Sequence, residues 1–340
     1  MYLHGALLAF LALTGAERLE TEDQDEIASL KVQLLQVGPA IRRRNGFDVA
    51  GALADRPPGA FGKLKVLTQA IGLTYNTTKP KNRPTSLNFT VDGVAWRALA
   101  SLSRNPAVGG VFARVFESTA SDPEAVVAFK GVCTEPQLEQ CQVDMCYLTQ
   151  IQNYGLESAR VAQLTGFDVT SCAKYAHLLD FTDQAARLVD EVRKSLPKHR
   201  LVLTGHSLGG MLAMSSAGFD VPAVAFAPTP SQSTKVGGNV ASLCDPYDCG
   251  INSFFVPNAR HGPTCLFLHQ EEPPPCQALP EPYENRTWRE LLEKQGDLVQ
   301  LLLCKGSAHR WPRYEAMVAA VADGRRSLPV CSHDFSAIGA

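Results

Sequence analysis

The sequence has little excess charge of either sign. Its 32 lysine and arginine residues are nearly balanced by 34 aspartate and glutamate residues, which leaves a net charge of −2. Nucleic-acid binding depends on a concentrated positive surface. The one dense basic run, Arg42-Arg43-Arg44, is more typical of a solvated helix face or a processing site. We therefore expect no nucleic-acid partner.

Long apolar runs are also scarce. A helix that spans a bilayer needs about 20 apolar residues, and outside the N-terminus no stretch approaches that length. The N-terminal run Gly5 to Gly15 is shorter and is followed by Ala16 and the acidic stretch Glu17 to Glu26. This pattern is typical of a cleaved signal peptide over residues 1–16, with a short uncleaved anchor or a buried helix as the alternatives.

Histidine pairs that would complete a zinc site beside cysteines are missing. The pairs Cys141/Cys146 and Cys244/Cys249 lie at the edge of zinc spacing without such partners, so we predict no metal, and no cofactor either. All ten cysteines follow the apolar run, and an even number after a signal sequence predicts disulfides formed in an oxidising lumen. The pairing stays open, although Cys244 with Cys249 and Cys265 with Cys276 are close enough for local bonds.

Three N-glycosylation sequons, at Asn76, Asn88 and Asn285, agree with a secretory route. The protein is thus expected in the secretory pathway, either secreted or in a vacuolar or lysosomal lumen. Oligomeric state is not indicated by any feature of the sequence.

The chain divides into a leader, one large domain and a tail. Residues 17–84 are predicted to form a helical, partly polar leader that ends in a proline- and asparagine-rich loop, and residues 326–340 a tail. Within 85–325, short apolar runs alternate with amphipathic segments. The expected strands are 125–129, 200–203, 221–226 and 264–269, with 298–304 either a last strand or the end of a helix; the expected helices are 95–102, 175–196, 211–217 and 313–321. Such alternation predicts an α/β domain with a mostly parallel sheet.

The strongest functional motif is Gly205-His206-Ser207-Leu208-Gly209. A bare G-x-S-x-G is weak evidence, but this one follows an expected strand and opens an expected helix, as a nucleophile elbow does. Glycines are needed at its ends because a Cβ there would collide with the neighbouring strand and helix. The helix N-terminus supplies backbone N–H groups for a developing oxyanion. The motif therefore predicts Ser207 as a nucleophile.

A serine nucleophile needs a base and an orienting acid, which follow it in the order Ser, acid, His in such proteins. Four of the eight histidines come after Ser207: His261, His269, His309 and His333. The acid should lie on a loop just after a strand, which favours Glu271 or Glu272 after 264–269 and leaves His309 or His333 as the base. We prefer His309, which follows the last expected strand. Asp245 and Asp248 are weaker candidates because they lie between two nearby cysteines.

Three stretches resemble the fungal-type (class 3) triacylglycerol lipases, which are α/β-hydrolases. They are the elbow Leu203–Ala213, the run Val126–Gly131, similar to the strand before the family's oxyanion loop, and Leu268–Pro273, similar to its acid segment. The run Val221–Phe226 and the cysteine-rich insertion are most similar to the vacuolar autophagy-type lipase branch. The resemblance implies the α/β-hydrolase fold, with helices on both faces of the sheet and a lid-like cysteine-bearing insertion at Cys141–Phe167. Apolar residues there, including Tyr147, Leu148, Leu156 and Phe167, would open onto lipid or pack in the core.

The resemblance also implies a reaction. Ser207 would attack a lipid ester at a membrane or lipid-droplet interface, His309 would take its proton, and Glu272 would hold the imidazole. Backbone N–H groups of Leu208 and Val132 would stabilise the oxyanion.

Two departures from the family pattern motivate a second hypothesis. The acid would be Glu272 instead of the usual Asp, and Val132 stands where the family generally has Ser or Thr. The match around His309 is also loose. The alternative is a protein of the same fold that binds lipid or partner proteins without turnover.

Overall fold

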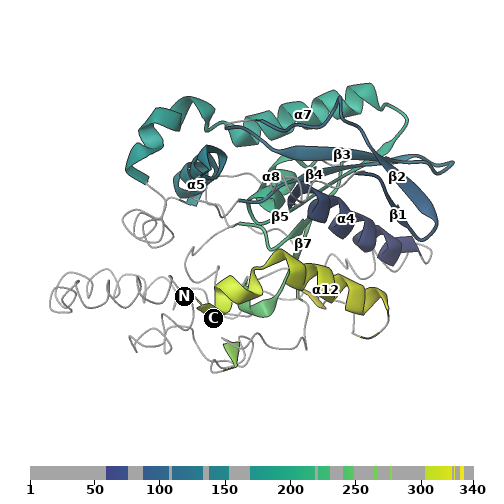
Figure 1. Ribbon diagram of the computed structural model, residues 1–340. Helices are drawn as coiled ribbons and strands as arrows, with labels where there is room; N and C mark the ends of the chain where they lie inside the picture. Colours follow the sequence, from purple (N-terminus) through teal and green to yellow (C-terminus); the bar gives the residue numbers. More distant parts are fainter. Residues whose placement is uncertain are drawn as a thin grey trace, which may run out of the picture.

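The structure is a computed structural model (Figure 1). It describes residues 59–75, 87–106, 109–132, 138–152, 169–218, 221–229, 240–248, 264–266, 276–277, 303–323, 325 and 330–332. The expected signal peptide lies outside these residues. Among the described helices, none combines the length and the apolar character needed to cross a membrane.

In the described part of the chain, a nine-stranded sheet with its strands in sequence order forms the centre of the fold. Strands β4 to β8 are parallel, whereas β1 to β3 at one end and β9 at the other join the sheet antiparallel. The strands are β1 Phe89–Val91, β2 Val94–Ala98, β3 Ala113–Ser118, β4 Glu124–Phe129, β5 Arg200–His206, β6 Ala223–Phe226, β7 Val240–Cys244, β8 Thr264–Leu266 and β9 Val330–Ser332. The parallel centre confirms the predicted α/β fold class.

Helices cover both faces of the sheet (Figure 1). They are α4 Gly59–Tyr75, α5 Glu139–Gln152, the 3-10 helix η3 Val169–Leu178, α7 Phe181–Ser195, α8 Leu208–Ser216 and α12 Trp311–Ala322. One core packs α5, α7 and α8 against the sheet, and a second core packs α4 and α12 against the opposite face.

Strand β4 shows how the sequence separates the two cores. Ala125, Val127 and Phe129 belong to the core beneath α7, and Val126 and Ala128 belong to the core beneath α4. Because successive side chains of a strand point to opposite faces, a continuous apolar run is buried on both sides. Short, continuous apolar runs therefore predict central strands that are buried on both faces.

Helix α4 comes from the predicted leader yet lies within the second core. Leu64, Leu67, Ala70 and Ile71 are buried there with residues of α12. Apolar residues at this helical spacing form a stripe that must be covered. The leader and the predicted domain thus share one core through α4.

Residues 95–102, predicted as a helix, instead contribute to strand β2. Trp96 is buried, whereas its neighbours Ala95 and Arg97 are exposed, which is the period of a strand. Trp96 pairs with Phe89 on one side and with Ser118 on the other. Cross-strand pairing outweighed the local apolar spacing. The segment 298–304 is helical at its described residues, within a helix over 303–308.

The predicted disulfides are confirmed, but one suggested pairing is wrong. Cys146 bonds Cys172, and Cys276 bonds Cys304 instead of Cys265. Cys141 is disulfide-bonded as well, so the Cys141/Cys146 pair is not available as a zinc site. Of the other local pair, Cys249 lies outside the described residues.

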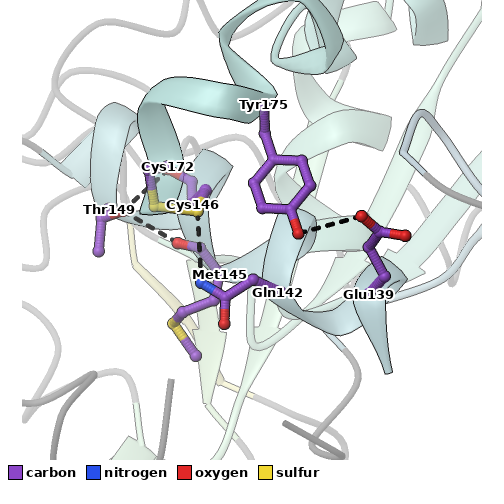
Figure 2. The surroundings of a disulfide bond; sticks show 7 residues. All are labelled: Glu139, Gln142, Met145, Cys146, Thr149, Cys172 and Tyr175. Carbon is purple, nitrogen blue, oxygen red and sulfur yellow. Dashed lines mark hydrogen bonds between the residues drawn. A yellow bond between two sulfur atoms is a disulfide. The ribbon is translucent and has the colours of Figure 1, made fainter. Parts of the chain in front are cut away.

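The Cys146–Cys172 bond ties α5 to η3 (Figure 2). Beside it, the Tyr175 hydroxyl of η3 donates to Glu139 of α5 at 3.2 Å. Tyr147, suggested as a lipid-facing lid residue, is buried and stacks on Phe181 of α7 at 4.5 Å. Helix α5 is therefore packed against α7 and bonded to η3. Leu156 and Phe167 lie outside the described residues.

Candidate active site

Ser207 occupies a sharp turn between β5 and α8. Its backbone has φ 58° and ψ −125°, a conformation that costs a non-glycine residue about 1–3 kcal/mol and is kept where the surroundings enforce it. The turn is closed by its neighbours: the Ser207 N–H donates to the Phe226 carbonyl at 3.0 Å. The elbow thus holds the Ser207 hydroxyl at the carboxyl end of the central strands.

Gly205 and Gly209 permit this turn because backbone approaches them closely. A Cβ at Gly205 would lie 2.2 Å from the Gly209 carbonyl oxygen, and one at Gly209 would lie 2.2 Å from the Phe129 carbonyl oxygen. Any larger residue would push the helix from the strands. The glycine requirement inferred from the motif is therefore met by the geometry.

His309 lies directly beside the serine hydroxyl. Its Nε2 is 2.8 Å from Ser207 Oγ, although the two residues are 102 positions apart in the chain. His309 comes just before α12, and its backbone N–H donates to the Lys305 carbonyl at 2.8 Å. The structure thus brings together the predicted nucleophile and the preferred base.

The acid beside His309 is Asp248, not the predicted Glu272. The two Asp248 oxygens lie 2.9 and 2.8 Å from His309 Nδ1. Because a carboxylate only accepts hydrogen bonds, Nδ1 carries a proton and donates it. That tautomer leaves the lone pair of Nε2 facing the Ser207 hydroxyl. Glu271 and Glu272 lie outside the described residues.

Asp248 lies just after a strand, as an orienting acid should, but the strand is β7 and not the predicted strand 264–269. Asp248 follows β7, and residues 240–244 were not recognised as a strand. Their sequence, Val-Ala-Ser-Leu-Cys, is short and mostly apolar, and all five residues are buried. From the sequence alone, Asp245 and Asp248 rank lower because they lie between two nearby cysteines. In the structure both side chains are completely buried.

Tyr314 contacts Asp248 from behind and is itself held by Asp245, which is paired with Arg313. The Tyr314 hydroxyl donates to Asp248 Oδ2 at 2.8 Å and accepts the Asp245 N–H at 2.9 Å. Burial, followed by the charges of Asp248 and Asp245, raises the pKa of Tyr314 well above its usual value, so this phenol stays a donor. Arg313 donates to Asp245 at 2.6 Å. Asp248 is consequently fixed in the orientation that His309 requires.

Tyr314→Phe is expected to lower kcat about 10-fold with little change in KM. The substitution removes one hydrogen bond to a buried charged group, worth about 1.5–3 kcal/mol, and frees Asp248 to turn away from His309. Steady-state hydrolysis of a soluble ester measures this effect. Tyr147→Phe is the matched control, because its hydroxyl contacts Thr182 at a distance from the site. Equal kcat values for the two variants would show that Tyr314 does not act on the acid.

The loop after β4 lies against the serine, as expected for an oxyanion site. A Cβ at Gly131 would lie 2.6 Å from the His206 carbonyl and 3.2 Å from Ser207 Cβ. Val132 follows it and is half-buried, and Leu208 begins α8 directly after the serine. The two residues predicted as oxyanion donors therefore lie on the two segments that meet at Ser207.

Thr229 is a neighbour of Ser207 that sequence reasoning missed. Its hydroxyl lies 3.4 Å from Ser207 Oγ, and its N–H donates to the Ser207 carbonyl at 3.0 Å. Thr229 follows β6 in a stretch, Ala-Pro-Thr-Pro, that holds no acid, so a search for an acid after each strand passes over it. A search for polar residues directly after β6 would have found it.

His206 packs behind the base as a neutral ring. Its centroid is 4.8 Å from that of His309. Burial, and then the charge of His309, hold the pKa of His206 well below its usual value. The ring is therefore uncharged in the folded protein at neutral pH.

A buried neutral histidine predicts acid destabilisation. The unfolded chain would protonate His206 near its ordinary pKa of 6.5, while the folded chain resists protonation. The unfolded state then binds more protons, so the free energy of unfolding should fall as the pH drops below that value. The expected slope from this one group approaches ~1.4 kcal/mol per pH unit. Urea unfolding between pH 7.5 and 5 measures it, and His206→Asn should flatten the curve; parallel curves would contradict the assignment.

The site combines a serine on a strained strand–helix turn, a histidine from far downstream and a buried aspartate. The chain is therefore an α/β protein with a serine–histidine–aspartate site. Residues 153–337 match the model of the Alpha/beta hydrolase family. The chain belongs to this family, which supports a hydrolase-type function.

Two solved fungal structures are similar at low identity. One is a mutant form of MDLA from Penicillium cyclopium, with a TM-score of 0.34, 12% identity, and coverage of 64% of this chain and 84% of that chain. The other is a fungal lipase, with a TM-score of 0.31, 11% identity, and coverage of 62% of this chain and 81% of that chain. No curated protein matches the sequence.

Proposed function

We propose that this protein is a serine-dependent carboxylic ester hydrolase that acts on lipid esters through an acyl-enzyme on Ser207. The observation that carries the proposal is the continuous chain of hydrogen bonds from Ser207 through His309 to Asp248. A base held in the correct tautomer and a nucleophile within its reach are the minimum that acyl transfer requires.

The reaction would proceed in two halves. His309 takes the Ser207 proton as the oxygen attacks the ester carbonyl, and Asp248 stabilises the imidazolium. The N–H groups of Leu208 and Val132 would bind the oxyanion, each donor of this kind being worth roughly 3 kcal/mol. The imidazolium then gives its proton to the departing alcohol. Water, deprotonated by His309, attacks the acyl carbonyl. The bond from the acyl carbon to Ser207 Oγ then breaks, the fatty acid leaves, and the imidazolium returns its proton to Ser207 Oγ.

The choice of a lipid ester rests on the resemblance of the elbow and the β4 loop to class 3 triacylglycerol lipases. Triacylglycerol or phospholipid at a membrane or lipid-droplet surface is the proposed substrate. The disulfides support an oxidising compartment, and Asn88, in one of the sequons, is exposed. We therefore propose that the protein resides in the secretory pathway, either secreted or in a vacuolar or lysosomal lumen.

One of the two observations that favoured the non-catalytic alternative no longer supports it. It rested on a glutamate acid and on Val132, and Asp248 supplies the usual aspartate at His309. Valine at position 132 removes only the hydroxyl donor that Ser or Thr would supply, because a backbone N–H is present whatever the residue type. A binding protein also has no need of a hydrogen-bonded base behind a strained serine.

A fluorophosphonate probe tests activation of the serine directly, and ester panels test the substrate. The purified protein should label at Ser207 in the native state and not after heat denaturation. It should also release fatty acid from emulsified triacylglycerol or phosphatidylcholine vesicles faster than from a soluble short-chain ester. Absence of labelling together with absence of fatty-acid release would overturn the proposal. Labelling with hydrolysis of soluble esters alone would remove the lipid substrate but keep the esterase.

A further inference from the structure

A tyrosine at the end of α4 contacts two parts of the active site at once. The Tyr75 hydroxyl lies 2.9 Å from His206 Nδ1. It also lies against Gly131, where an added Cβ would be only 2.2 Å from the hydroxyl oxygen. Tyr75 comes from a helix that sequence analysis assigned to the leader, and no motif pointed to it.

Both members of the Tyr75–His206 pair are neutral. Burial, the dominant effect, raises the pKa of Tyr75, and the hydrogen bond with the Gly131 backbone lowers it, so the phenol keeps its proton. Burial also holds the pKa of His206 well below its usual value, so the ring that shares a hydrogen bond with the Tyr75 hydroxyl is uncharged. Gly131, Tyr75 and His206 therefore form one chain of contacts through a single hydroxyl.

Each end of this chain adjoins a group that the reaction uses. Gly131 precedes Val132, the proposed oxyanion donor, and lies beside Ser207. The His206 ring packs at 4.8 Å on the ring of His309, the base. A displacement of either end would move a donor or the base relative to the ester carbonyl, and displacements of about 1 Å can cost 10²-fold in rate.

The rest of α4 and α12 holds Tyr75 in place. The Tyr75 ring stacks on Trp311 with a centroid separation of 6.3 Å. Gly72 lies where the two helices meet, and an added Cβ there would be in ordinary van der Waals contact with Trp311 Nε1 at 3.5 Å. Ile71 is fully buried in the shared core. The hydroxyl is thus delivered by a rigid helix and not by a loop.

We propose that Tyr75 is a positioning residue for the reaction at Ser207, in which one hydroxyl fixes both the oxyanion loop and the histidine ring behind the base. The inference rests on the proposed esterase function. It makes α4 part of the catalytic unit, although the helix precedes the residues that match the family model.

Tyr75→Phe tests the inference because it removes only the hydroxyl and keeps the ring on Trp311. We expect kcat for a soluble ester to fall about 10- to 100-fold with KM within twofold, and the rate of fluorophosphonate labelling to fall in parallel. The Gly131 amide should exchange its hydrogen at least 10-fold faster. Thr68→Val is the matched control, since it removes another buried α4 hydroxyl that bonds only within the helix, to Leu64 and Lys65.

The outcomes separate this inference from the proposed function. If wild type and Thr68→Val label and hydrolyse while Tyr75→Phe is slow in kcat with unchanged melting temperature, the positioning role is supported. If Tyr75→Phe matches wild type in kcat, the positioning role is overturned, whatever the amide exchange shows, and the esterase stands. A rise in KM alone overturns it as well. A wild-type protein that neither labels nor hydrolyses overturns the esterase, and the positioning role with it.

Discussion

Ser207→Ala is expected to abolish ester hydrolysis. Loss of the nucleophile from a site of this type lowers kcat by about 10⁶-fold, because the acyl-enzyme can no longer form. Fatty-acid release from emulsified and soluble esters, followed at saturating substrate, measures the effect. Fluorophosphonate labelling of the same preparation should disappear.

The fold should be unchanged in this variant. Alanine replaces one small side chain, and the backbone of the turn stays enforced by Gly205 and Gly209. Equal melting temperatures would establish that activity, and not folding, was lost. Ser215→Ala is a suitable control on the same helix, because its hydroxyl bonds only to the Leu212 carbonyl. Equal rates for wild type and Ser207→Ala would end the proposed mechanism.

Asp248→Asn is expected to lower kcat by about 10⁴-fold. The amide nitrogen of asparagine can donate to His309 Nδ1, which would place the imidazole proton on Nε2 and leave no lone pair for the Ser207 hydroxyl. An equivalent change in a related triad has an effect of this size. Hydrolysis of a soluble ester measures it, with a melting curve to check that the buried substitution is tolerated.

Glu272→Gln provides the decisive comparison for the acid. The side chains of Asp248 and His309 are in contact. The Asp248→Asn variant should therefore lose nearly all activity, while the Glu272→Gln variant keeps a kcat close to that of the wild type. The reverse result would restore Glu272 as the orienting acid. Loss of activity in both variants would require a second measurement, the fluorophosphonate labelling rate, which should fall only for the residue that holds His309.

The candidate site was predictable where its signal is local. Glycine spacing, a preceding strand and a following helix are all contiguous in sequence, so Ser207 was predicted from residues 200–217. His309 was reached by elimination, through the chain order of such sites. Asp248 was missed because its signal is not local: the side chain is recognised as buried only once β7 has taken its place beside β6 and β8.

Other errors have the same origin. Residues 95–102 satisfied a helical period, but pairing with β1 and β3 made them a strand. The predicted leader supplies α4, whose apolar side is buried against α12. Cys276 is closer in sequence to Cys265 but bonds Cys304. In each case a partner distant in sequence decided the outcome.

The sequence by itself determined the alternating α/β architecture, the disulfide-rich character and the strained serine turn, because periodicity and glycine sterics act between near neighbours. Tertiary structure alone decided which carboxylate faces His309, which helix delivers Tyr75, and how the described cysteines pair. Those choices depend on which buried groups come within about 3 Å of each other, and that is fixed only when the strands and helices have packed.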